Sequence, residues 1–324
     1  MRKLALIATM IVFVIVGGMV FATGQQEETT GFDYPKKDIT LIIGFGAGGG
    51  TDTTGRVFIE ALGKQIPGVN LVPTNMAGAG GTVGATHVLN AKPDGYTLFI
   101  AHPGIPVPYL KGNFDHTYAD YTPIASFADS SVAMYVNGES PYYTVDDIVA
   151  DVKAAPDSLI MGVSTGTLIH LASLHMEQEN GVSFKKVSIG GGQPTAPELL
   201  SGRVDTFLQS ISVGAPYVKS GDFRALAVFG SERVEAFPDV PTFQELGLPY
   251  TFEQSFGLWA PPETPADIIA YLSDAVEKAC ADPEYVEALA VLGVRSGYRA
   301  TADYEALLAE SFAELEETAP LMNK

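Results

Sequence analysis

The sequence is poor in the residues that build metal, disulfide and nucleic-acid sites. Its 324 residues include one cysteine, five histidines and 19 lysines and arginines, against 38 aspartates and glutamates. The single Cys280 has no partner for an internal disulfide, and only His170 and His175, on one predicted helix, lie close enough to suggest ligand spacing. The net charge of −19 repels nucleic acid and anionic lipid headgroups. We therefore expect no metal ion, no cofactor and no nucleic-acid partner.

Long apolar runs are also scarce, and the clearest one is at the start of the chain. A basic start precedes the apolar run Leu4–Val16, and Val20-Phe21-Ala22 then offers a peptidase site. This order predicts a signal peptide over residues 1–22 and a periplasmic protein whose mature chain does not span the membrane. A permanent anchor is the alternative, because the run approaches the ~18 residues that cross a bilayer. The polar residues 23–33 predict a flexible tether.

Apolar strands alternate with helical segments along the rest of the chain, which is typical of an α/β protein with parallel-rich sheets flanked by helices. About 290 residues exceed one comfortable core, so we expect two domains. The first takes residues 32–126 together with 250–324, and the second takes 127–249. Two crossing segments, near 124–131 and 224–252, would form the hinge. The predicted strands cover residues 39–43, 69–72, 96–101, 124–136, 159–163, 184–189, 204–208 and 224–229, and the predicted helices residues 53–65, 145–154, 167–179, 194–200, 265–281, 283–292 and 302–318.

A glycine-rich loop joins the first predicted strand to the first helix. Gly44, Gly46 and Gly49 match the dinucleotide pattern G-x-G-x-x-G. A dinucleotide site also needs an acidic residue about 20 positions further on, and the next strand ends in Thr74-Asn75 instead. The loop still offers close backbone approach and exposed N–H groups at a helix start, which suit an anion. We expect anion binding here, with a purely structural turn as the alternative.

A second loop resembles the nucleophile elbow of hydrolases. Residues 162–166 match G-x-S-x-G with Ser164 as the nucleophile. The usual triad order also needs a histidine well beyond this serine, but His170 and His175 both lie on the very next helix. We expect the Ser164, Thr165 and Thr167 hydroxyls to donate to a carboxylate at the helix start. A secreted serine hydrolase using Ser164 is the alternative function.

Three further segments come after predicted strands: the glycine turns at residues 77–81 and 189–192, and His102 after the third strand. In an open α/β sheet, ligands bind beyond the carboxyl ends of the strands. His102 could donate to a carboxylate or be a structural histidine. Asp52 could bind a ligand ammonium group, or it could cap the helix and pair with Arg56.

Taken together, these segments resemble the extracytoplasmic receptors of tripartite tricarboxylate transporters, the Bug family. The similarity runs along nearly the whole mature chain, in short motifs whose order and spacing are specific. The motifs are Tyr34-Pro35, Phe45 to Asp52 with Arg56, Asn75, Gly78 to Gly81, Gly84-Ala85, Pro93 to Leu98, Gly190 to Gly192, Leu199 to Asp205, Arg224 to Val228, Pro238 to Phe243 with Glu245 and Gly247, and Trp259 to Pro261.

The resemblance implies a two-domain type II periplasmic-binding-protein fold that closes like a Venus flytrap. It also implies that one small carboxylate is held by two pincer loops, Phe45–Asp52 and Ser164–Thr167, mainly through backbone amides and hydroxyls. The receptor would be a monomer that delivers its ligand to a transporter with one large and one small membrane subunit; a sensor-linked binding protein is the alternative. The expected ligand contacts are Phe45, Gly46, Ala47, Gly48, Gly49, Thr51, Asp52, Gly78, Ala79, His102, Ser164, Thr165, Thr167, His170, Gly190, Gly191 and Gln209.

The chain departs from the family pattern at positions that face the expected ligand. Gly46 replaces the usual alanine, Met76-Ala77 replaces Arg-Pro, and Leu168 removes a hydroxyl donor. His102-Pro103 replaces small hydroxyl residues, and Gln209 stands where a small residue or an aspartate is common, so it could read the distal end of the ligand. The ligand could be a di- or tricarboxylate, an acidic amino acid or an aromatic acid.

Overall fold

The computed structural model describes residues 33–189, 195–248 and 251–323. Residues 35–324 form one compact unit, separate from residues 1–34. The predicted signal peptide and all but the last residue of the predicted tether lie outside the described residues. No helix in the described ranges is both long and apolar enough to cross a membrane.

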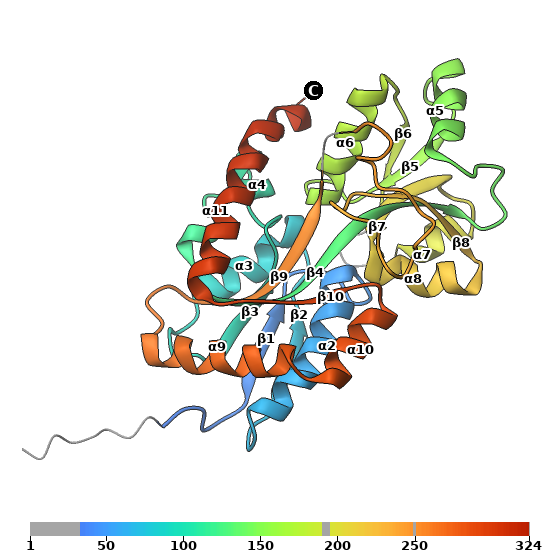
Figure 1. Cartoon of the computed structure of the whole chain (residues 1–324). Coiled ribbons are helices and arrows are strands. Elements are labelled where there is room, and N and C mark those ends of the chain that lie inside the picture. Colours follow the sequence, from blue (N-terminus) through green and yellow to red (C-terminus); the bar gives the residue numbers. More distant parts are fainter. Residues whose placement is uncertain (1–32, 190–194, 249–250, 324) are drawn as a thin grey trace, which may run out of the picture. The chain divides into compact units, whose positions relative to one another are not determined.

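Ten strands of the described residues form one mixed sheet with helices packed against it (Figure 1). Pairing is parallel among the outer strands and antiparallel around the two longest strands. In sheet order the strands are β2 (Leu71–Asn75), β1 (Ile39–Ile43), β3 (Thr97–Ala101), β9 (Glu253–Ala260), β4 (Thr122–Asn137), β7 (Thr206–Ser210), β5 (Ile160–Val163) and β6 (Lys185–Ser188), with β8 (Phe223–Val228) and β10 (Arg295–Arg299) also paired to β4.

The helices connect and cover these strands. In chain order they are α2 (Gly50–Gln65), α3 (Thr82–Leu89), α4 (Val107–Leu110), α5 (Val145–Ala154), α6 (Leu168–Asn180), α7 (Ala196–Leu200), α8 (Ile211–Ser220), α9 (Ala266–Cys280), α10 (Pro283–Val291) and α11 (Thr301–Thr318), with short 3₁₀ turns η1 (Ala79–Gly81), η2 (Tyr118–Asp120) and η3 (Ala319–Asn323).

The long strand β4 belongs to both halves of the sheet. Its residues up to Ser131 pair with β9, whereas those from Val132 onward pair with β7 and β8. We therefore call β2, β1, β3, β9 and β10 the first half, and β5 to β8 the second half. A second connection runs from Phe229, whose N–H donates to Val132 O, to Phe252, whose N–H donates to Phe229 O. The two predicted crossing segments lie at these positions, and the predicted domain boundaries remain a proposal.

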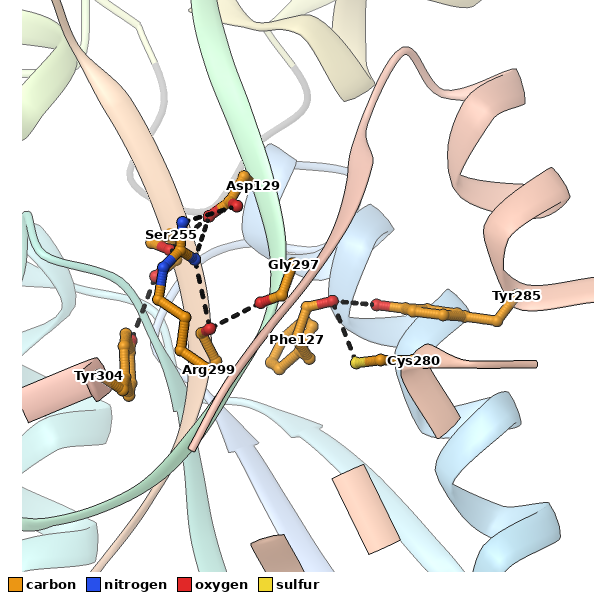
Figure 2. A network of polar contacts seen from close by, with 9 residues as sticks. Phe127, Asp129, Ser255, Cys280, Tyr285, Gly297, Arg299 and Tyr304 are labelled. Atoms are coloured by element: carbon orange, nitrogen blue, oxygen red, sulfur yellow. Dashed lines mark hydrogen bonds and ion pairs between the residues drawn. The ribbon is translucent and has the colours of Figure 1, made fainter. Parts of the chain in front are cut away.

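A polar network joins three strands near this crossing (Figure 2). The Arg299 guanidinium on β10 donates to both carboxylate oxygens of Asp129 on β4, at 2.9 and 3.1 Å, and to Ser255 Oγ on β9 at 3.0 Å. Tyr304 Oη donates to Ser255 O at 3.1 Å. The side chains of Arg299 and Asp129 are 33% and 14% exposed, so removing one would leave the other only partly solvated. The network therefore connects β10, β4 and β9 where β4 leaves the first half.

Helix α11 contacts the hydrophobic cores of both halves. Near its start, Tyr304 and Leu308 pack with Trp259 in the core of the first half. Near its end, Leu315 packs with Leu171 of α6 in a core of the second half. Since α6 begins at the cavity described below, the C-terminal helix supports the position of that cavity wall.

The structure confirms most of the predicted elements, including β1 and α5 with the same bounds. The prediction placed only helices after residue 249, and it missed the strands β9 and β10 in this region. Helices α3 and α8 were also missed, because α3 combines glycine with β-branched residues and α8 contains Pro216. Tertiary packing outweighs these local preferences.

Candidate functional site

A cavity of about 200 Å³ lies beyond the carboxyl ends of β1, β3, β5 and β7. This volume is below the ~300–1,000 Å³ typical of drug-sized ligand sites, so it suits a small molecule. Both halves of the sheet contribute to its wall. The lining residues are Gly44, Phe45, Gly46, Gly49, Gly50, Thr51, Ala77, Gly78, Ala79, Gly80, Gly81, His102, Ser164, Thr165, Thr167, Leu168, Ile169, Ser188, Ile189, Thr195, Gln209, Ser210 and Gln254.

The glycine-rich loop brings the start of α2 to this cavity. Gly49 is the N-cap and provides no side chain, so no side-chain cap occupies the first N–H groups of the helix. Gly50 and Thr51, at the first two helical positions, line the cavity. A side chain at Gly50 would not fit, because its Cβ would lie 2.5 Å from Ser210 Cβ on the second half. Glycine here allows two helix starts from opposite halves to meet.

Asp52 braces the loop from behind. Its carboxylate accepts hydrogen bonds from Gly48 N at 2.9 Å, Asn75 Nδ2 at 2.8 Å and Arg56 Nε at 2.9 Å. Burial alone would raise the pKa of Asp52, but the hydrogen bonds from Arg56, Gly48 and Asn75 outweigh burial and lower it. Because its oxygens already have these donors and Asp52 is absent from the cavity wall, the geometry favours the structural interpretation over a ligand ammonium contact.

In the second loop, the hydroxyls of Ser164 and Thr167 donate hydrogen bonds to backbone carbonyls of the protein itself. Ser164 Oγ donates to Ile189 O at 3.1 Å, and Thr167 Oγ1 donates to Ser164 O at 2.7 Å. A hydroxyl carries a single hydrogen, so these two groups order the loop and are not free donors in this conformation. Thr167 is the N-cap of α6, and Leu168 and Ile169 follow it in the cavity wall. The donors that this loop can offer to a ligand are therefore the first N–H groups of α6 and the Thr165 hydroxyl, which also lines the cavity.

The carboxyl end of β7 supplies amide and hydroxyl groups. Gln209 Nε2 donates to Thr195 Oγ1 at 2.9 Å, while Gln209 Oε1 accepts from Ser210 N at 2.9 Å. Ser210 is the N-cap of α8, and its Oγ lies 3.1 Å from Ser212 Oγ. Thr53 Oγ1 of α2 lies 3.2 Å from the same Ser212 Oγ and 3.1 Å from Gly49 O. This hydroxyl chain links the starts of α2 and α8.

His102 presents a neutral imidazole to the cavity. It is 3% exposed, and its ring stacks on Phe45 with 5.1 Å between centroids. Gly104 N donates to His102 Nδ1 at 3.0 Å, which leaves the proton of the neutral ring on Nε2. Burial lowers the pKa of His102 to about 4. His102 is therefore a neutral N–H donor at ordinary pH.

The buried imidazole predicts a loss of stability in mild acid. Between its unfolded pKa of about 6.5 and its folded pKa, the unfolded chain binds a proton that the folded chain does not. The contribution of His102 is complete above pH 6.5 and is lost as the pH falls towards 4. Between about pH 7.5 and pH 5, we expect the unfolding free energy of His102→Gln to fall by about 2 kcal/mol less than that of the natural protein. Urea unfolding at both pH values measures it, with His87→Gln on the exposed face of α3 as control; an unchanged pH dependence in His102→Gln would contradict it.

The cavity wall contains no lysine, arginine, aspartate or glutamate among the described residues. Instead, the starts of α2, α3, α6 and α8 all contribute to it, through Thr51, Gly81, Leu168 and Ser210. Each helix start carries a partial positive charge and N–H groups without intrahelical partners. Such a wall can solvate a carboxylate without a formal countercharge.

The structure brings most of the predicted contacts together. Phe45, Gly46, Gly49, Thr51, Gly78, Ala79, His102, Ser164, Thr165, Thr167 and Gln209 line the cavity, whereas Ala47, Gly48, Asp52 and His170 do not, and Gly190 and Gly191 lie outside the described residues. His170 faces the loop instead, where its Nδ1 accepts from Gly166 N at 3.4 Å. The sequence prediction missed Thr195, Ser210 and Gln254. Ser210 has a recognisable signal as an N-cap serine, but Gln254 lies on the unpredicted strand β9.

Comparisons with known proteins agree on one family. The sequence model of the tripartite tricarboxylate transporter family receptor matches residues 55–321. A Cupriavidus necator protein of the UPF0065 group is 35% identical over 282 residues, covering 86% of this chain and 85% of its own. Among solved structures, the periplasmic binding protein BugD superposes with a TM-score of 0.81 at 27% identity, covering 90% of this chain and 98% of its own. MatC from Rhodopseudomonas palustris, solved with bound malate, has a TM-score of 0.82 at 29% identity, covering 88% of this chain and 100% of its own.

Proposed function

Because this chain belongs to the tripartite tricarboxylate transporter receptor family of periplasmic solute-binding proteins, we propose that it captures a small dicarboxylate in the cavity between the two halves of its sheet. The family is one of receptors rather than enzymes, and its fold is that of the periplasmic binding proteins. The malate bound to MatC supports a dicarboxylate as the ligand.

The observation that carries the proposal is the convergence of helix starts on an uncharged cavity wall. α2 and α3 come from the first half, and α6 and α8 from the second. A carboxylate between them gains donors from both sides only when the halves are close. The ligand therefore stabilises the closed state over the open one, which is the basis of flytrap closure.

Delivery to a membrane transporter follows from the same closure. A transporter with one large and one small membrane subunit would recognise the closed surface and release the ligand by opening it. Export through a cleaved signal peptide would bring the receptor to the periplasm as a monomer. A sensor partner would read the same closed surface, and the structure offers no observation that favours it.

A ligand panel tests the proposal. We expect malate, succinate or a related diacid to bind with a Kd near 1 μM, about −8 kcal/mol, and to stabilise the protein by about 2.7 kcal/mol at 100 times Kd. Thermal unfolding with each acid, followed by isothermal titration calorimetry, measures this. Neutral sugars and nucleotides are the controls. Stabilisation by a sugar alone, with no response to any acid, would overturn the assignment.

The hydrolase alternative receives no support from the geometry. Ser164 Oγ donates to a backbone carbonyl, and among the described residues no histidine accepts its hydrogen. His170, the next histidine along the chain, accepts from Gly166 N instead. We expect neither the natural protein nor Ser164→Ala to hydrolyse a panel of esters, while both still bind the diacid. Ester turnover that disappears in Ser164→Ala would support the enzyme.

A further inference from the structure

Gln254 on β9 lies in the cavity wall with an unused hydrogen-bond acceptor. The residue is 5% exposed, and its Oε1 is buried without a hydrogen-bond partner among the described residues. It pairs across the sheet with Ser130, on β4 beside the crossing between the two halves. Buried side-chain amides normally have partners, so an orphaned one in a ligand cavity points to a partner that arrives with the ligand.

Gln209, the other glutamine of the cavity wall, already has hydrogen-bond partners for both ends of its side-chain amide. Gln209 Oε1 already accepts from Ser210 N, and its Nε2 donates to Thr195 Oγ1. Gln209 is therefore fixed in orientation, with one N–H and one lone pair of Oε1 left. Of the two glutamines, Gln254 is the one whose acceptor oxygen has no partner at all among the described residues.

We propose that Gln254 is a specificity-determining residue that accepts a hydrogen bond from a ligand hydroxyl, so that the preferred ligand is a hydroxy-dicarboxylate. This inference rests on the proposed function and narrows its ligand class. The terminal torsion of glutamine is broad and roughly two-fold. A ligand that carries a donor selects the amide orientation with the oxygen towards the cavity.

A hydroxyl fits the site better than an ammonium group. The cavity wall contains no aspartate or glutamate among the described residues, so an ammonium would lose its water without gaining a countercharge. Asp52, the acidic residue of the nearby loop, is committed to Gly48, Asn75 and Arg56. An uncharged donor satisfies Gln254 without that cost.

Binding of three matched acids tests this role. Malate, succinate and aspartate share a four-carbon diacid skeleton and differ only in carrying a hydroxyl, no substituent or an ammonium. We expect the natural protein to bind malate about tenfold more tightly than succinate, and aspartate more weakly than malate. In Gln254→Met, which keeps the side-chain length but removes the acceptor, we expect malate and succinate to bind within about twofold of each other. Titration calorimetry at pH 7.5 gives the ratios.

The control is Thr54→Val. Thr54 Oγ1 is also buried without a partner, but Thr54 does not line the cavity. This variant should keep the natural malate-to-succinate ratio, which separates a ligand contact from a general effect of removing a buried polar atom.

The outcomes separate this inference from the proposed function. Binding of none of the diacids would defeat the proposed function itself. Equal binding of malate and succinate by the natural protein, or a malate preference that survives in Gln254→Met, would overturn the role of Gln254 and leave diacid binding intact. If Gln254→Met does not fold by circular dichroism, equal binding of malate and succinate by the natural protein still overturns the role of Gln254.

Discussion

Alanine at Gly80 is expected to weaken ligand binding about 100-fold while each half of the sheet stays folded. Gly80 lies in η1 of the first half at a φ of +72°, and a Cβ there would be 2.7 Å from Gly166 O in the loop before α6. Carbonyl oxygen cannot yield as a flexible side chain can. The two loops would have to separate, and overpacking of this kind costs about 3 kcal/mol, which is about 100-fold in affinity.

Strain from the left-handed backbone has to be distinguished from this steric effect. Gly112, at a φ of +68°, has nothing within 4 Å of its would-be Cβ. Gly112→Ala therefore carries the same backbone penalty without blocking the two loops. A Cβ at Gly80 would also lie 2.9 Å from Pro108 Cγ of α4, so we expect Gly80→Ala to unfold at a somewhat lower urea concentration than Gly112→Ala, and only Gly80→Ala to lose affinity in titration calorimetry. Equal affinities in the two variants would show that the loops need not approach each other to bind the ligand.

The contact between Gly80 and Gly166 illustrates what the sequence could not predict. The glycine turn at residues 77–81 and the loop at 162–166 were each identified as sites beyond strand ends, because glycine and strand-to-helix order are local signals. Their mutual distance depends on how β4 passes from one half of the sheet to the other. No local pattern contains that information, and the antiparallel strand β9 beside β4 was itself missed.

Strand β9 also explains why the site prediction was incomplete. Its residues are almost fully buried, but they mix Gln254, Ser255 and Gly257 with apolar neighbours, so they lack both alternation and a continuous apolar run. By contrast, the apolar run of β1 identified it from sequence alone. Ser164 and Gln209, on well-predicted strand ends, were expected at the site and line the cavity, whereas Gln254 lines the cavity without having been expected there.

The hydroxyls of Ser164 and Thr167 lie where the sequence predicted them, but their hydrogen bonds differ from the prediction. The sequence predicted Ser164 and Thr167 as ligand donors because both precede a helix. The structure places both in the cavity wall but directs their hydrogens to Ile189 O and Ser164 O. Which of several acceptors a hydroxyl chooses depends on neighbouring backbone carbonyls, and those are set by the β5–β6 pairing.

Removal of the Asp52 carboxylate is expected to lower the free energy of unfolding by about 3 kcal/mol in Asp52→Ala. The side chain of Asp52 is 5% exposed, and the variant leaves three donors without their acceptor: Gly48 N, Asn75 Nδ2 and Arg56 Nε. The side chain of Arg56 is 46% exposed and its charge can be solvated, so the expected loss lies at the lower end of the range for breaking a buried ion pair. Urea unfolding at pH 7 measures the difference, with Asp115→Ala on an exposed loop as the control.

The pH dependence of this deficit identifies its cause. Because the pKa of Asp52 is lowered in the folded chain, its contribution is complete above the unfolded pKa of about 3.9 and is lost as the pH falls through the lower folded value. The deficit of Asp52→Ala should therefore be constant from about pH 5 to pH 8 and shrink below about pH 4. Ligand affinity should fall as well, since the loop that presents the start of α2 loses its brace. A variant of natural stability with reduced affinity would instead mean that Asp52 contacts the ligand directly.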